Sequence, residues 1–428
     1  MKFSKEALVV GFALFAMFFG AGNLILPPFL GFFAGSQWYL VALGFVISAV
    51  GLPLLGIFAH ARLQGGMFNF AEKISPVFSL IFCILIYVIS VVLPAPRTAA
   101  VTHEIAVQPF FDVSPLTTSI IYFLLVFVFV IKRSTVINNI GKFLTPAILL
   151  LLLSIIFSGF FSEYKPMAKP VTKLPVLNGF FEGYQTFDAI AALVVGGVII
   201  ISVKLKGYTS RIEIRQIITS SAILAALGLF LVYGGLIYNG AMVNSEFPAD
   251  ITRTQLLSGI SQLNLGSMAK ISLAILVALA CFTTAVSIIT GTADFMAERI
   301  HKTYVYQITV TIACILGIVM GAFSVNAIIE IALPVLLLAY PLTIVLILLN
   351  VMPAKLRTTL VMRATVIATI IFSLPDALKY VLTTQLFGDV QKWIPLSIYG
   401  LGWVIPAFLA FFIAILWQNK TGQRTSKY

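Results

Sequence analysis

The stretch MFFGAGNLILPP, residues 17–28, lies within an apolar run that is long enough to cross a lipid bilayer. It contains two glycines and an asparagine followed by a double proline, which an uninterrupted membrane helix avoids. Glycine costs about 1 kcal/mol in a helix interior, and proline costs about 3 kcal/mol. A break at membrane depth is tolerated only where the freed backbone groups are buried in protein or line a cavity. The stretch therefore predicts a broken helix that contributes to a binding site inside the membrane.

The composition of the whole chain is typical of a helical membrane protein. Of its 428 residues, 60% are hydrophobic and 10% are charged, whereas soluble domains carry about 25% charged residues. The net charge of +12 does not indicate a nucleic acid partner, because the basic residues cluster in alternate short loops and so report membrane orientation. The three cysteines lie in apolar runs, and we interpret them as packing residues. No small-residue cleavage site follows the first apolar run, so we expect it to be retained.

Counting apolar runs of about 20 residues, the length that crosses a bilayer, predicts an all-α fold with twelve membrane spans. The first six expected spans are residues 7–33, 38–60, 77–100, 116–131, 143–161 and 176–203. The second six are residues 214–242, 268–296, 305–323, 327–352, 360–380 and 394–417. Most lysines and arginines fall in loops on the side of the N-terminus, which predicts that both termini are cytoplasmic. We expect residues 1–428 to form a single transmembrane transporter domain.

A second interruption, in the sixth expected span, indicates an internal repeat. The segment GYQTFD, residues 183–188, interrupts this span as GAGN, residues 20–23, interrupts the first. The two broken spans are an odd number of spans apart, so repeats that begin with them have opposite orientations in the membrane. We therefore expect a 5+5 inverted repeat of residues 7–161 and 176–352, with residues 360–417 peripheral. Matching breaks in inverted halves predict a binding site near the middle of the membrane.

The two sides of the first break suit different ligands. Gly20, Ala21 and Gly22 begin the second half-helix, whose free N–H groups and positive dipole end suit a substrate carboxylate. The first half-helix ends near Ala16 and Phe19, whose carbonyl groups suit a small cation. The alternative is that the glycines only permit close helix packing.

Two polar residues beside the breaks are further candidates. Asn23 offers a side-chain oxygen next to the first break, which packing glycines would not need. Asp188 lies next to the second break, and carboxylates within the membrane are functional candidates because they are costly to bury. The alternative role for Asp188 is that of an N-cap for the second half-helix, and one aspartate can serve both roles.

The eighth expected span carries a pair of hydroxyl groups, Thr283 and Thr284, shortly after Ala280. Adjacent threonines in an apolar helix commonly hydrogen-bond to their own backbone. A hydroxyl pair with nearby carbonyl groups is also a set of hard oxygen ligands, which suits sodium better than a transition metal. The residues alone leave both interpretations open.

Four stretches resemble the bacterial branched-chain amino acid:cation symporter family (BrnQ-type carriers). They are GFALFAMFFGAGNL (11–24), PRTA (96–99), GYQTFDA (183–189) and LACFTTA (279–285), and the resemblance extends over nearly the whole chain. This family belongs to the amino acid–polyamine–organocation superfamily and is expected to share the fold of the sodium-coupled leucine transporters. The resemblance implies a symporter of the bacterial cell membrane that takes up leucine, isoleucine and valine with Na+ as the coupling ion. It implies no obligatory protein partner.

The same resemblance assigns roles to particular residues. The N–H groups of Gly20, Ala21 and Gly22 would hold the substrate carboxylate, and carbonyl groups around Gly183 and Tyr184 would receive its amino group. The implied sodium ligands are the carbonyl groups of Ala16, Phe19 and Ala280 and the hydroxyl groups of Thr283 and Thr284. In the family pattern the position of Thr284 is often serine. In some relatives a residue matching Asn23 touches a second sodium ion, whereas Asp188 has no clear counterpart.

Charged residues within the spans are candidates for gates. Arg97 and Glu330 would be costly in hydrocarbon, so we expect Arg97 to pair with Glu330 or with Asp188 at an outer gate. A permanent structural bridge is the alternative. At the end of the eighth span, Asp294 is the candidate for an inner gate with basic residues near the N-terminus, and a surface contact without gating is the alternative there.

The sequence also allows alternatives to sodium symport. One is a proton-coupled carrier of the same or another amino acid, or of a nucleobase, in which Asp188 or Glu330 titrates. A channel would lack saturable, coupled uptake. An enzyme is not indicated, because the sequence contains no metal-ligand cluster, nucleophile motif or phosphate-binding loop, and its three histidines lie far apart.

Overall fold

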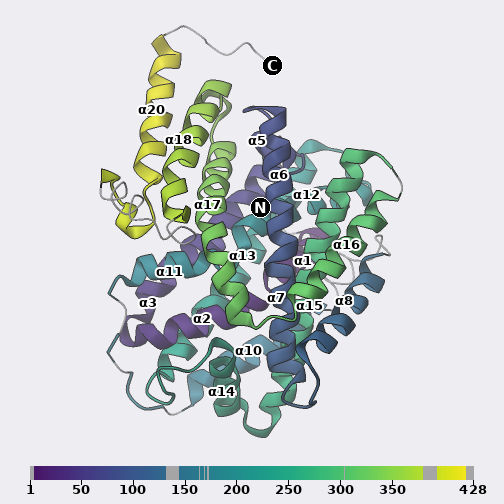
Figure 1. Ribbon diagram of the computed structural model, residues 1–428, viewed down its shortest axis with the longest axis vertical. Helices are drawn as coiled ribbons and strands as arrows, with labels where there is room; N and C mark the ends of the chain where they lie inside the picture. The colour runs from purple at the N-terminus through teal and green to yellow at the C-terminus, as the bar shows by residue number, and fades with distance from the viewer. Residues whose placement is uncertain are drawn as a thin grey trace.

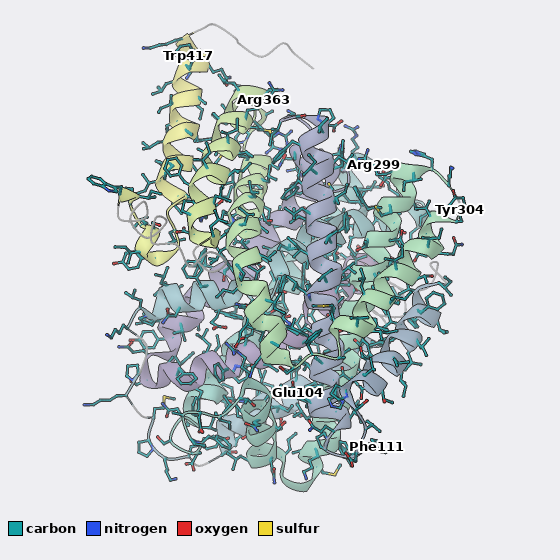
Figure 2. All side chains as sticks on the ribbon, in the orientation of Figure 1. Glu104, Phe111, Arg299, Tyr304, Arg363 and Trp417 are labelled. Atoms are coloured by element: carbon teal, nitrogen blue, oxygen red, sulfur yellow. The ribbon has the colours of Figure 1, made fainter. Side chains whose placement is uncertain are left out.

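The computed structural model describes residues 4–131, 144–162, 164–167, 169–170, 173–302, 304–378 and 393–420. Every regular element within these ranges is a helix, and the helices form one bundle (Figure 1). Arg299, Arg363 and Trp417 lie towards one end of this bundle, whereas Glu104 and Phe111 lie towards the other (Figure 2).

The helices of the first part of the chain follow the order of the first five expected spans. The first range contains α1 (Lys5–Phe18) and α2 (Ala21–Ala34), with a break between them. Helices α3 (Trp38–Val46) and α4 (Leu52–Leu63) join through a π-helical turn at Ile47–Gly51. The short α5 (Phe68–Ala71) precedes α6 (Pro76–Val92), which is interrupted at Leu93 and continues as α7 (Pro94–Thr102) and η3 (His103–Val107). This part ends with α8 (Pro115–Val130) and α10 (Thr145–Phe161).

The helices of the second part begin with another broken pair, α11 (Pro175–Tyr184) and α12 (Asp188–Leu205). They continue with α13 (Arg211–Met242), α14 (Arg253–Leu265), α15 (Ala269–Ile300), α16 (Val305–Met320) and α17 (Val325–Val351). The last two, α18 (Thr359–Leu378) and α20 (Val404–Lys420), pack against each other at one edge of the bundle (Figure 1). Helix α14 was not among the expected spans.

The described helices are those of a multi-pass membrane protein. Among the described residues, seven helical segments are long and apolar enough to cross a membrane, and α8, α10, α16 and α20 are shorter apolar helices. On α8, the side chains of Leu124, Leu125 and Val128 are more than half exposed, as side chains that face lipid are. The all-helical membrane class predicted from the composition is therefore confirmed. The count of twelve spans and the inverted repeat remain predictions.

Close backbone contacts hold α11, the helix before the second break, against α3. A Cβ atom on Gly44 of α3 would overlap the carbonyl group of Val176 on α11, and one on Gly179 would overlap that of Val41. These glycines let α3 and α11 approach until their backbones touch. Helix α13 packs along both α1 and α2, and α15 contacts α1 and α12. The two breaks are thus enclosed by neighbouring helices, as non-helical backbone at membrane depth requires.

Candidate functional site

The two helix breaks lie against each other. Phe19 and Gly20 separate α1 from α2, and Gly20 has an extended backbone with φ −127° and ψ −158°. Residues 185–187 separate α11 from α12, and Phe187 adopts a left-handed conformation with φ 64°. Asn23 Nδ2 donates a hydrogen bond of 2.8 Å to Asp188 Oδ2, which joins the breaks directly. Both breaks predicted from the sequence are therefore present. Helix α2, which follows the first break, continues through Pro27 and Pro28.

Asp188 is the centre of a buried polar cluster that joins three helices. Its side chain, Asn23 and Tyr233 are each at most 1% exposed. The Tyr233 hydroxyl donates to Asp188 Oδ2 over 2.8 Å, and Asn23 Nδ2 lies close to the same hydroxyl. Phe187, not Asp188, occupies the N-cap position of α12. The carboxylate therefore links α12 to α2 and α13, and the alternative role as an N-cap does not describe its contacts.

The glycines of the first break allow polar groups to approach it. The N–H group of Gly20 donates to Asn23 Oδ1 over 3.1 Å. A Cβ atom on Gly20 would lie 2.5 Å from Thr284 Oγ1, and one on Gly22 would overlap Arg97 Nη2. Glycine at both positions is thus explained by close contact with a hydroxyl and with a guanidinium group. Packing against the apolar face of a helix would not involve either group.

Thr283 and Thr284 of α15 place hydroxyl groups beside the end of α1. Thr283 Oγ1 lies 3.0 Å from the carbonyl oxygen of Ala16 and 2.9 Å from that of Ala280. Thr284 Oγ1 is buried and has no hydrogen-bond partner among the described residues. Phe19 directly follows α1 and is fully buried. Thr283 therefore makes the backbone contact expected of any helical threonine and also bridges to α1.

The oxygen atoms of this cluster are donors of the kind that a small, hard cation requires. Hydroxyl and carbonyl oxygens are hard ligands that suit small, hard cations. A buried hydroxyl without a partner costs about 1–3 kcal/mol, and a cation bound beside Thr284 would remove that cost. Within the described ranges, no group of three His, Cys, Asp or Glu residues could hold a metal ion. The donor set therefore fits an alkali cation.

Gly183 and Tyr184, the expected partners of the substrate amino group, lie at the end of α11. The Gly183 carbonyl accepts a 2.8 Å hydrogen bond from Thr186 Oγ1, and the Tyr184 carbonyl accepts one of 3.0 Å from the N–H group of Phe187. The Tyr184 ring stacks on Tyr340 with centroids 4.1 Å apart. Both tyrosine hydroxyl groups are buried without a partner. These carbonyls already accept hydrogen bonds within their own turn.

The expected gate residues lie in different surroundings. Arg97 is 2% exposed and donates from Nη1 to the carbonyl of Gln185 over 2.7 Å. Glu330 is exposed on α17, and no ion pair among the described residues joins it to Arg97. Asp294 is buried and lines a cavity of about 210 Å³ together with Glu298. Lys2, one of its expected partners, lies outside the described residues. Gating by these residues remains a prediction.

Two residues at the breaks were not identified from the sequence. Tyr233 lies in the middle of α13, where nothing in its apolar surroundings distinguishes it from a packing residue. Gln185 lies inside the quoted motif, but no role was assigned to it. Its carbonyl accepts from Arg97, and its buried Oε1 atom has no partner. A polar residue within a break is a signal that could have identified Gln185.

The proteins whose sequences are similar to this chain are described as transport proteins, permeases or carriers of branched-chain amino acids. A family model described as branched-chain amino acid transport protein matches residues 3–421. The branched-chain amino acid permease BraB of Bacillus subtilis is 34% identical over 422 residues, which cover 96% of this chain and 94% of the permease. A putative branched-chain amino acid carrier protein of Staphylococcus saprophyticus is 32% identical over 448 residues, covering 97% of this chain and 98% of that protein.

Solved structures with similar folds include a symporter. The substrate-bound, outward-open structure of a Na+-coupled sialic acid symporter has a TM-score of 0.60 and 14% identity, covering 96% of this chain and 90% of that chain. The structure of MhsT in complex with L-phenylalanine has a TM-score of 0.57 and 17% identity, and the match covers 95% of this chain and 98% of MhsT. These similarities place the helix arrangement among transporter folds. From the extent of the family match and the identity to its relatives, this chain belongs to the branched-chain amino acid transport protein family, whose members are membrane transporters and not enzymes.

Proposed function

We propose that the protein is a secondary active symporter that takes up leucine, isoleucine and valine together with sodium. The observation that carries the proposal is the oxygen cluster at the end of α1, where Thr283 bridges to Ala16 and Thr284 has a buried, unpartnered hydroxyl. The names of the relatives support branched-chain amino acids as substrates. The fold shared with a Na+-coupled symporter supports sodium as the ion.

The position of this cluster explains how ion binding would drive transport. An ion shifts a conformational equilibrium only if its interactions differ between the conformations. A sodium ion held between α1 and α15 has ligands on both helices, so a movement of α1 relative to α15 changes its coordination. Sodium binding would thus favour the conformation in which both helices contribute ligands. Release of the ion would permit the alternate conformation, as alternating access requires.

The substrate would bind at the adjacent breaks. The first N–H groups of α2, at Ala21 and Gly22, have no partner within the helix and suit the carboxylate. Asp188 and the free Oε1 atom of Gln185 offer acceptors for the ammonium group. One methylene in an apolar pocket is worth only about 1–3 kcal/mol, so we expect weak discrimination among leucine, isoleucine and valine.

The proposal includes a membrane topology. Twelve spans would form a 5+5 inverted repeat of residues 7–161 and 176–352, with α18 and α20 peripheral. Arg62 near the end of α4 and Arg211 and Arg215 at the start of α13 line a cavity of about 730 Å³. Their positive charge supports placing these helix ends, and both termini with them, in the cytoplasm of a bacterial cell.

Proton coupling is the second candidate, and Asp188 is the observation that favours it. This carboxylate is 1% exposed and joins α12 to α2 through Asn23. Its protonation would therefore change a contact between the two broken helices. Glu330, the other candidate for titration, is exposed on α17 and lacks such a position.

Uptake of labelled leucine into proteoliposomes distinguishes the two candidates. A sodium gradient, a proton gradient and both together are imposed on separate samples of the same preparation. The proposal predicts accumulation with the sodium gradient alone and none with the proton gradient alone. The opposite pattern would select proton coupling through Asp188, and equal leucine entry without any gradient would contradict symport.

A further inference from the structure

Arg97 of α7 lies between the two breaks in a fully enclosed position. Its side chain is 2% exposed. The Nη1 atom donates to the carbonyl of Gln185 over 2.7 Å, and the guanidinium carbon lies 5.1 Å from the centroid of the Phe187 ring. Within the described part of the chain, the buried Nε atom has no hydrogen-bond partner. The guanidinium group therefore retains unused donor capacity at the site.

Arg97 forms no direct ion pair among the described residues, although the carboxylate of Asp188 interacts with its charge. The described ion pairs join other residues, and the nearby carboxylate of Asp188 accepts its hydrogen bonds from Asn23 and Tyr233. One carbonyl and one aromatic face stabilise a cation only partly. Because a buried charge that is only partly compensated is unfavourable, this environment favours an anionic ligand.

The geometry indicates where such a ligand would bind. Arg97 Nη2 occupies the space beside Gly22, where a Cβ atom would overlap it. Gly22 belongs to the first turn of α2, whose N–H groups have no partner within the helix. Guanidinium and backbone N–H groups are both donors only, and a carboxylate accepts from them in a forked arrangement.

We propose that Arg97 binds the carboxylate of the substrate directly, together with the N-terminal N–H groups of α2. This inference rests on the proposed function and deepens it, because it makes a free carboxylate a requirement for binding. It gives Arg97 a role in substrate recognition that differs from pairing with Glu330 at a gate. Amines and alcohols with the same apolar side chain would leave the guanidinium unpaired and would bind weakly.

The test measures equilibrium binding of leucine and of leucinol, in which a hydroxymethyl group replaces the carboxylate. Competition against labelled leucine is measured with the purified full-length protein in sodium chloride. We expect the wild-type protein to prefer leucine by about 10- to 100-fold, the value of a hydrogen-bonded charge pair. Arg97→Gln should remove most of this preference by weakening leucine binding selectively, and Arg97→Lys should retain part of it.

Arg253→Gln provides a matched control. Arg253 also lies over a phenylalanine ring, that of Phe29, and pairs with Glu182 at 3.5 Å, but it belongs to α14 and does not contact Gly22. Its substitution should leave the preference for leucine over leucinol unchanged. An Arg97→Gln protein that keeps the wild-type preference, or that loses affinity for both ligands equally, would overturn the inference alone. If Arg97→Gln does not fold, the same criteria apply to Arg97→Lys. A wild-type protein that binds no branched-chain amino acid would overturn the proposed function and this inference with it.

Discussion

Thr283 Oγ1 lies 3.0 Å from the carbonyl oxygen of Ala16, a residue 267 positions away in the sequence. This hydrogen bond ties α15 to the last turns of α1, immediately before the first helix break. Thr284, the next residue, has a buried hydroxyl without a partner among the described residues and faces Gly20 within the break. The backbone that would bind substrate and the oxygen atoms that would bind sodium thus lie around the same helix break.

Replacing Thr284 tests its assignment as a sodium ligand. Thr284→Ala removes the unpartnered hydroxyl without unsettling any hydrogen bond of the described structure. We expect the sodium concentration for half-maximal leucine uptake to rise about 10- to 100-fold, the value of one oxygen contact to a charge. Thr284→Ser keeps the hydroxyl and should remain close to wild type. Equal sodium dependence of all three proteins would contradict the assignment.

Adding a methyl group at Gly20 should impair the same site. A Cβ atom there would lie 2.5 Å from Thr284 Oγ1, so Gly20→Ala must push Thr284 away from the break. We expect sodium-stimulated uptake to fall about 10-fold or more, as misplacement of a binding group does. Gly234→Ala on α13 is the control, because a Cβ atom there meets nothing within 4 Å. Similar uptake by both variants would show that the contact with Thr284 is unimportant.

The cluster around Asp188 should stabilise the fold as well as the site. Asp188→Asn replaces an acceptor oxygen with an NH2 group, which opposes the donors of Asn23 and Tyr233. Hydrogen bonds to charged groups are worth about 1.5–3 kcal/mol, so the variant should unfold at a clearly lower temperature. Tyr233→Phe removes one donor and should have a smaller effect. Thermal unfolding in detergent measures both, and an unchanged transition for Asp188→Asn would refute the role of the cluster.

The contact between α3 and α11 should affect the stability of the protein and not its sodium site. A Cβ atom on Gly179 would overlap the carbonyl of Val41, so Gly179→Ala must separate the two helices. Overpacking of this kind costs about 1–3 kcal/mol, whereas alanine is otherwise the better helix former. Gly179→Ala should therefore lower the unfolding temperature, and Gly234→Ala should leave it unchanged or raise it. A higher unfolding temperature for Gly179→Ala than for Gly234→Ala would show that α3 and α11 can separate without loss of stability.

The sequence predicted the helical class and both breaks because these depend on local chemistry. Glycines and polar residues inside apolar runs are visible in the sequence, and they mark the segments where α1 and α11 end. The double proline suggested a further disturbance, yet α2 continues through it. Helix α2 packs against α13, and neighbouring helices in an enclosed bundle allow a membrane helix to tolerate prolines.

Contacts between distant helices were predicted less well. The sequence placed Arg97 in a span but gave no means of knowing that α7, which begins after an interruption at Leu93, would bring it between the breaks. Tyr233 could not be distinguished from a packing residue. Glu330 was expected to be paired because it lies in an apolar run, but α17 presents it at the surface. Which face a helix turns inwards depends on its neighbours, and these are not visible in one sequence.

The most direct test of sodium-coupled symport is leucine-dependent entry of radioactive sodium into proteoliposomes. The protein is reconstituted, and sodium entry is followed with and without an inward leucine gradient, with Thr283→Val as the variant that removes the bridge to Ala16. We predict that leucine stimulates sodium entry through the wild-type protein and that Thr283→Val abolishes the stimulation. Sodium entry that is unaffected by leucine, together with full leucine uptake in sodium-free medium, would contradict the account.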